Sequence, residues 1–166
     1  MKTKCVAHVA YTLTDMERTF WFINSDGNRY SRVLTFETIE RCKDVSRVDR
    51  EVAFEFFRVE RDASIEEVFD EMERNGLLPA IYEEARGFLN EYPNEQMYLE
   101  DMPIPIYVLG SETIVDGRRC ITCLDEDGVR RNDHERNLDC ASLVLNTRSI
   151  DSWGAHTTFL AVRENP

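Results

Sequence analysis

Short runs of β-branched and aromatic residues alternate with polar turns along the first part of the chain. The runs cover residues 5–13, 19–23, 30–36 and 52–59. Such runs predict strands, and the Asp26-Gly27 pair between two of them is a strong hairpin signal. Apolar residues over 37–46 have helical spacing, but the pattern there is ambiguous. We expect a strand-rich N-terminal part over residues 1–63.

The middle of the chain has helical periodicity with clear ends. Ser64 followed by Glu67 is the pattern of a capping box, and Gly76 stands where a left-handed C-terminal cap belongs. The apolar stripe of this helix consists of Ile65, Val68, Phe69 and Met72. A second helix is predicted after Pro79. Its apolar face consists of Ile81, Ala85, Phe88 and Leu89. These features predict a helical segment over residues 64–102.

Strand patterns return in the last third of the chain. They cover residues 104–109, 118–124 and 158–163. Asp116-Gly117 is a turn signal between two of them. From Asp127 to Thr157 the chain is dense in Arg, Asn, Asp, Ser and Thr, and long loops of this kind are more often functional than idle. We therefore expect an α+β protein in three parts, the third over 103–166, or one continuous domain.

Negative charge is concentrated in the middle of the chain. The sequence has 32 acidic and 20 basic residues, a formal net charge of -12, and residues 51–102 hold 15 acidic and 4 basic residues, which is -11. Generic polyanion binding needs clustered Lys and Arg, so we expect no nucleic-acid partner. The acids on the predicted helices are Glu66, Glu67, Asp70, Glu71, Glu73, Glu83, Glu84 and Glu91. They lie largely off the apolar stripes, as in a solvated face or in an acidic adaptor surface for a basic partner.

Composition also indicates the cellular compartment in which we expect the protein. No run approaches the roughly 18 apolar residues of a membrane-spanning helix, so we expect no membrane partner. The N-terminus has no convincing signal-peptide cleavage site. Five cysteines, an odd number in a chain of 166 residues, favour a reducing compartment. We therefore expect a cytoplasmic protein.

One group of cysteines with a histidine is a candidate metal site. Cys120, Cys123, His134 and Cys140 offer three thiolates and one imidazole, a ligand set that tetrahedral zinc uses. However, Cys120 and Cys123 lie in a predicted strand, where residues three apart point to opposite faces. Buried thiols and no cofactor are the preferred interpretation. A zinc-binding or enzymatic protein that uses these residues is the alternative.

Trp153 is the candidate recognition residue of the long polar stretch. It stands among small polar residues, near Asp151 and His156, and this composition is typical of an adaptable binding surface. The alternative is that Trp153 anchors the loop in the core. His134 and His156 have the side chain that titrates near neutral pH. No catalytic motif accompanies them, so catalysis is unsupported.

Five short motifs follow one another in the last third of the chain. They are Val108-Leu109-Gly110-Ser111, Gly117 to Leu124, Arg136-Asn137-Leu138-Asp139, Asp151-Ser152-Trp153 and Phe159 to Arg163. In this order they resemble the C-terminal domain of small bacterial proteins with a C-type-lectin-like fold. That group includes retroelement-diversified variable proteins and relatives of the formylglycine-generating enzyme's fold. The resemblance covers little more than half of the chain.

The resemblance implies a twisted antiparallel sheet that holds both ends of a long irregular loop, whose exposed side chains bind a ligand. Carried over to this chain, the ligand-binding surface consists of Asn137, Asp139, Asp151, Trp153 and His156. The chain departs from the pattern at residues 143–149, which look like an insertion, and it has no calcium motif of animal lectins. The reactive cysteine pair of the formylglycine chemistry has no clear counterpart. The resemblance therefore implies a non-catalytic, bacterial or phage-related module that binds an unidentified protein or small molecule, with the oligomeric state left open.

Overall fold

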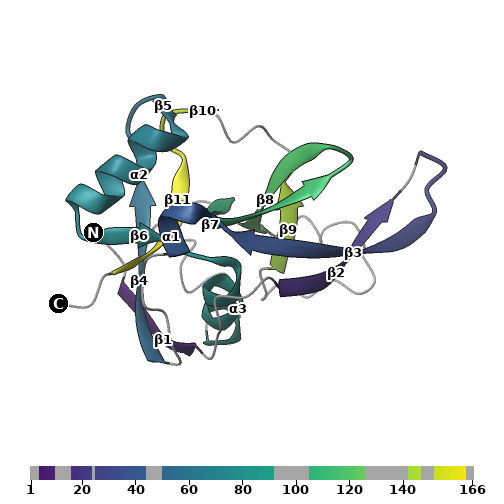
Figure 1. The fold of residues 1–166 in the computed structure, drawn as a ribbon, viewed down its shortest axis with the longest axis horizontal. Coiled ribbons are helices and arrows are strands. Elements are labelled where there is room, and N and C mark those ends of the chain that lie inside the picture. The colour runs from purple at the N-terminus through teal and green to yellow at the C-terminus, as the bar shows by residue number, and fades with distance from the viewer. Residues whose placement is uncertain are drawn as a thin grey trace.

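A mixed sheet with helices packed against its faces organises the described part of the chain (Figure 1). The structure is a computed structural model, and it describes residues 4–9, 16–23, 25–43, 50–91, 105–125, 142–146 and 152–163. For β1 (Lys4–Val9), β2 (Met16–Ile23) and β9 (Ser142–Asn146) this description concerns the backbone and its pairing. The predicted α+β class is confirmed.

The sheet takes strands from all along the chain. Besides β1, β2 and β9 it contains β3 (Arg29–Thr38), β4 (Arg50–Arg58), β6 (Leu77–Pro79), β7 (Ile106–Val115), β8 (Arg118–Asp125) and β11 (Thr158–Arg163). The main path runs β1-β4-β11-β7-β3-β2, with β8 and β9 continuing from β7 and β6 lying beside β11. Strands β7 and β11 pair in parallel, and the other pairs are antiparallel. Because β11 pairs with β4 and β7, the C-terminal strand joins the first and last parts of the chain.

Two helices cover opposite faces of the central strands. Helix α2 (Ile65–Arg74) packs on one face and α3 (Tyr82–Glu91) on the other, so they lie on either side of the sheet in Figure 1. Neighbouring residues of β11 alternate between these faces: Leu160 packs on the α3 side and Phe159 on the α2 side. Strands buried on both faces have apolar residues at consecutive positions. This burial explains the continuous apolar run at 158–162.

Helix α2 has the ends that its sequence predicts. The Ser64 hydroxyl accepts a hydrogen bond from the Glu67 N–H at 3.2 Å, and the Glu67 carboxylate accepts one from the Ser64 N–H at 2.8 Å. Gly76 has a φ of +68°, and its N–H donates to the Glu73 carbonyl at 2.9 Å. The capping box and the glycine C-terminal cap are both confirmed. The apolar stripe Val68, Phe69 and Met72 is buried against the sheet.

A chain of backbone hydrogen bonds places helix α1 (Glu40–Lys43) near α2. Ala80 N–H donates to the Leu160 carbonyl, Gly110 N–H to the Ala80 carbonyl, and Ile39 N–H to the Gly110 carbonyl, at 2.9–3.0 Å. Position 110 has to be glycine, because a Cβ there would lie 2.5 Å from the Ala80 oxygen. Ile39 leads directly into α1, so this bridge fixes where α1 begins. The ambiguous segment 37–46 thus contains the end of β3 and one helical turn.

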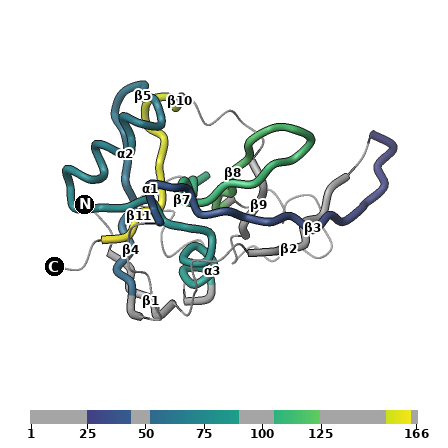
Figure 2. The backbone as a smooth tube through the Cα atoms, viewed as in Figure 1, coloured from purple at the N-terminus to yellow at the C-terminus, as the bar shows by residue number. Residues whose placement is uncertain are grey.

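The structure also differs from the sequence-based predictions in the polar stretch and at the start of α3. The stretch from Asp127 to Thr157, expected as one irregular loop, contains β9 and also β10 (Ser152–Trp153), which pairs with β5 (Ala63–Ser64) at the start of α2. Figure 2 shows this pairing of distant segments at the top of the molecule. Strand β9 overlaps the residues 143–149, and whether they are an insertion relative to the resemblance pattern stays a prediction. Glu83 and Glu84, expected on a solvated face, are buried at the start of α3.

Candidate functional site

Trp153 lies in the core, at the position that the core-anchor alternative describes. Its side chain is 1% exposed and packs edge-to-face on Phe159 at 5.4 Å and against Tyr107 at 4.6 Å, measured between ring centroids. All three rings belong to the cluster beneath α2. A ligand at the surface does not reach this ring. The geometry therefore favours the anchor over an exposed recognition group.

His156 lies in a tight turn close to Trp153, but its side chain is exposed. It has a φ of +68°, and its N–H donates to the Val59 carbonyl at 2.7 Å. Its Nδ1 is 3.0 Å from Oε2 of Glu60. The neighbouring Ala155 N–H donates to the Asp62 carboxylate at 2.9 Å. The turn is thus pinned to the segment between β4 and β5, with one imidazole at its surface.

The two cysteines of the candidate zinc site lie on opposite faces of the sheet. Cys120 packs in a cluster with Tyr82 of α3, and Cys123 packs in the cluster under α2. Both are buried, and burial raises the pKa of the Cys120 thiol, which is the opposite of what a metal ligand or reactive thiol needs. The two sulfurs therefore do not share a tetrahedral site. A zinc site that uses both of these cysteines together is therefore not supported by their positions, and the zinc alternative remains a prediction.

The remaining residues of the two sequence-predicted sites fall outside the described part of the chain. They are Asn137, Asp139 and Asp151 of the ligand-binding surface, and His134 and Cys140 of the zinc site. The structure thus places two of the five predicted ligand-binding residues, Trp153 and His156. These two residues do not form a shared surface, because Trp153 is buried and the side chain of His156 is exposed.

The outer face of α2 is a charged surface with a defined geometry. Glu66, Asp70 and Glu73 stand at intervals of four and three residues, which places their side chains along one side of the helix. Because the opposite side of α2 is apolar and buried, these carboxylates are held at the surface. Their side chains are 73%, 58% and 71% exposed. We call this row of carboxylates the α2 acidic row.

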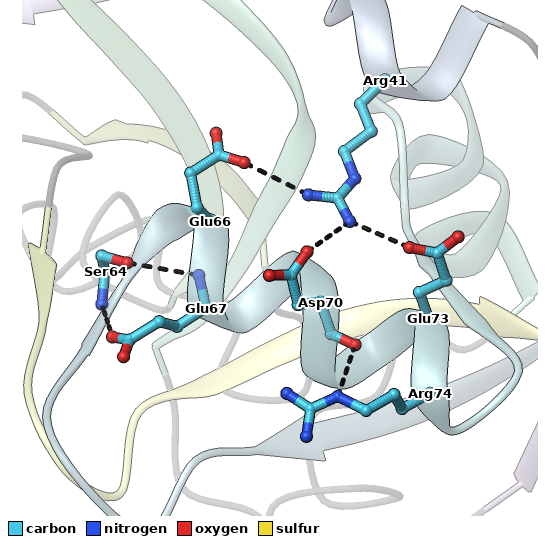
Figure 3. Close-up of polar contacts among 7 residues, drawn as sticks. All are labelled: Arg41, Ser64, Glu66, Glu67, Asp70, Glu73 and Arg74. Atoms are coloured by element: carbon cyan, nitrogen blue, oxygen red, sulfur yellow. Dashed lines mark hydrogen bonds and ion pairs between the residues drawn. The ribbon is translucent and has the colours of Figure 1, made fainter.

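Arg41 of α1 lies across the α2 acidic row (Figure 3). Its Nη1 is 3.2 Å from Glu66 Oε2, and its Nη2 is 2.7 Å from Asp70 Oδ1 and 3.0 Å from Glu73 Oε2. Its guanidinium carbon lies 5.5 Å from the centroid of the Phe69 ring, within the range of a cation–π contact. One guanidinium thus contacts three carboxylates and an aromatic ring. The α2 acidic row has the geometry of a guanidinium-binding surface, and an arginine of the same chain occupies it.

Local electrostatics fit this arrangement. The hydrogen bond to Asp70 and the charges of Asp70 and Glu73 raise the pKa of Arg41, against a smaller opposing effect of burial. At the helix start, the Ser64 N–H and then the charge of Arg61 lower the pKa of Glu67. Acids in the first turn also interact favourably with the positive end of the helix dipole.

The α2 acidic row has acceptor capacity beyond Arg41. Each of its carboxylates uses one oxygen for Arg41, and the second oxygen makes no hydrogen bond to another described residue. Exposed ion pairs are worth about 0.2–1 kcal/mol each, so the Arg41 contacts are exchangeable with contacts to another cation. The row is suited to binding a positively charged group rather than to chemistry.

Sequence reasoning identified the acids of this site but missed Arg41. The acids follow from helical spacing outside the apolar stripe. Arg41 lies 25 to 32 positions away from them along the chain, in the segment whose pattern is ambiguous. Its pairing is set by the backbone bridge through Gly110, which no local signal in the sequence reports.

Comparison with known proteins identifies no relative: no protein-family model, no curated protein and no solved structure matches the chain. Function is therefore inferred from the geometry of the chain itself. Over the ranges that the structure describes, no helix is long and apolar enough to cross a membrane.

Proposed function

We propose that this protein is a non-catalytic binding module, and that the α2 acidic row binds an arginine-containing basic segment of a protein partner. The observation that carries the proposal is the position of the Arg41 side chain. Its guanidinium contacts Glu66, Asp70 and Glu73 and lies over the ring of Phe69. A guanidinium from a partner would find the same acceptors. The concentration of -11 of the net charge in residues 51–102 supports this choice, because a negative surface attracts a basic segment during encounter.

Arginine suits this surface better than lysine. A guanidinium has five donors in one plane and stacks on aromatic rings, whereas an ammonium is a compact, strongly hydrated point charge. Arg41 uses two of its nitrogens for the three carboxylates of the α2 acidic row while its guanidinium lies over the ring of Phe69. We therefore expect the partner segment to be selected for arginine.

Binding of an arginine nonapeptide and of a lysine nonapeptide tests this proposal. Both peptides carry a fluorophore, and Kd is measured by fluorescence anisotropy at low salt. The arginine peptide should bind more tightly, and Glu66→Gln/Asp70→Asn/Glu73→Gln should weaken its binding. Three exposed pairs at about 0.5 kcal/mol each correspond to about a tenfold rise in Kd.

A matched control separates the α2 acidic row from net charge. The variant Glu37→Gln/Glu60→Gln/Asp116→Asn removes three exposed acids that lie outside α2. An equal rise in the Kd of the arginine peptide in both triple variants would mean that binding depends on net charge alone. Equal affinity for the two peptides would contradict arginine selection.

The C-type-lectin-like display surface remains a prediction. Three of its five residues, Asn137, Asp139 and Asp151, lie outside the described residues, and Trp153 is buried. Trp153→Ala distinguishes the alternatives: an anchor loses stability, and a recognition residue loses ligand binding while the fold is retained. The cytoplasmic location likewise remains a prediction.

A further inference from the structure

Helix α1 has two neighbouring residues that attach it to different parts of the molecule. Arg41 contacts the α2 acidic row, while the side chain of Cys42 is 1% exposed and packs in the cluster on the α3 side of the sheet. Successive residues of a helix point about 100° apart, so one short turn joins the two attachments. Movement of the α1 backbone away from α2 would therefore displace both residues, Arg41 from the α2 acidic row and Cys42 from its cluster.

Within the described residues, three neighbouring positions attach α1 to the rest of the protein. The helix has four residues, far fewer than an isolated helix needs for stability in water. Its own ion pair, between Glu40 and Lys43, is internal and does not attach it to the rest of the protein. The described attachments are Arg41, Cys42 and the preceding Ile39, whose N–H donates to the Gly110 carbonyl. Among them, the contacts of Arg41 are the exposed and charge-based ones, and salt weakens such contacts.

We propose that α1 is an electrostatic strap: the Arg41 contacts hold it closed on α2, and their loss opens α1 and makes the Cys42 thiol accessible. A cation that competes for the α2 acidic row then opens the strap. In that part the inference rests on the proposed function, because the competing cation is the arginine of the partner. Partner binding and thiol accessibility become linked, and in the free protein Arg41 acts as an intramolecular competitor of the partner.

Alkylation of the full-length protein by iodoacetamide, mapped to each cysteine by mass spectrometry, tests the strap. Cys120 and Cys123 are buried in the sheet and serve as internal references within the same molecule. Arg41→Ala should accelerate alkylation of Cys42 about tenfold, because several exposed charge contacts are lost together, and leave the references unchanged. Acceleration of all three cysteines would show general destabilisation and would overturn the proposal.

A matched arginine provides the control. Arg32 of β3 is 36% exposed, close to the 37% of Arg41, and pairs at 3.1 Å with Asp116 in the turn between β7 and β8. Arg32→Ala should leave the Cys42 rate unchanged. In the wild type, an increase in NaCl from about 0.05 M to about 0.5 M should accelerate Cys42, and in Arg41→Ala the same increase should have little effect. A rate of Cys42 alkylation in the wild type that does not change with salt concentration would contradict the strap.

A double-mutant cycle tests the specific contact. Glu66→Gln/Asp70→Asn/Glu73→Gln should accelerate Cys42 as Arg41→Ala does, and the combination should add little, because both changes remove the same contacts. Full additivity would mean that Arg41 and the α2 acidic row act independently, which the proposal forbids.

The arginine nonapeptide separates this inference from the proposed function. At saturation the peptide should accelerate Cys42 alkylation in the wild type, and Arg41→Ala should bind the peptide more tightly. Peptide binding with an unchanged Cys42 rate overturns the strap and leaves the binding function intact. Absence of peptide binding together with a salt-dependent Cys42 rate removes the binding function and retains the strap.

Discussion

Helices α2 and α3 have the same length, ten residues, and each has two glutamates in its first turn. Their acids nevertheless have opposite surroundings. The side chain of Glu66 is 73% exposed, whereas Glu84 is 0% exposed. The cause is where each helix begins: α2 starts beside the small β5–β10 pair, while α3 starts against β7, where the Tyr82 N–H donates to the Ser111 hydroxyl at 2.9 Å. The same local pattern therefore yields a charged surface in one helix and buried carboxylates in the other.

The largest expected effect lies on the inner face of α3. Phe88 is fully buried and packs edge-to-face on Phe54 at 5.3 Å and on Phe56 at 5.9 Å between ring centroids. Phe88→Ala should lower the free energy of unfolding by about 3–5 kcal/mol, because it removes these contacts and leaves a cavity. Urea unfolding followed by circular dichroism measures the loss. Leu89→Ala, at a partly buried position on the same helix, should cost less.

A smaller effect distinguishes the buried acid of α3 from the exposed acids of α2. The Glu84 carboxylate accepts a hydrogen bond from the Ile81 N–H at 3.0 Å. Glu84→Ala leaves that buried N–H without its acceptor and should cost about 1–3 kcal/mol in urea unfolding. Glu84→Gln retains an acceptor and should cost less. Glu66→Gln, at the surface of α2, should stay within about 0.5 kcal/mol of the wild type. Equal costs for Glu84→Ala and Glu66→Gln would break the comparison between the helices.

The smallest effect concerns the pH dependence of α2. The Ser64 N–H lowers the pKa of Glu67 below its ordinary value in the folded protein, so this interaction stabilises the fold above that ordinary value. The stabilisation disappears as the pH falls through the folded-state pKa. We therefore expect Glu67→Gln to flatten the acid side of the curve of unfolding free energy against pH. Glu71→Gln on the same helix is the control, and an identical flattening there would contradict the role of the capping box.

Much of the fold could be predicted from local pattern. The ends of α2, the apolar faces of both helices and the Asp116-Gly117 turn follow from residue types at fixed short spacings. The opposite orientation of Cys120 and Cys123 follows from the two-residue period of a strand. These features depend on interactions within a few residues, so the sequence reports them directly.

Only one part of the candidate site, its row of acids, could be predicted from the sequence. The α2 acidic row follows from helical spacing, but Arg41 depends on how α1 is placed by Ile39, Gly110 and Ala80, which come from three different parts of the chain. The interpretation of Trp153 also depended on the structure. A tryptophan among small polar residues has the composition of a binding surface, yet the pairing of β10 with β5 turns its ring into the core under α2.

The sequence by itself determined helices α2 and α3, the caps of α2, the glycine turns and which side of α2 carries charge, because hydrogen bonding and side-chain periodicity within one or two turns decide them. The tertiary structure alone decided that Glu83 and Glu84 of α3 are buried, that β9 and β10 form within a polar stretch, and that Arg41 lies on the α2 acidic row. Each of these outcomes requires contacts between segments far apart in the chain. Such contacts are selected by packing of the whole sheet and leave no periodic signal in either segment.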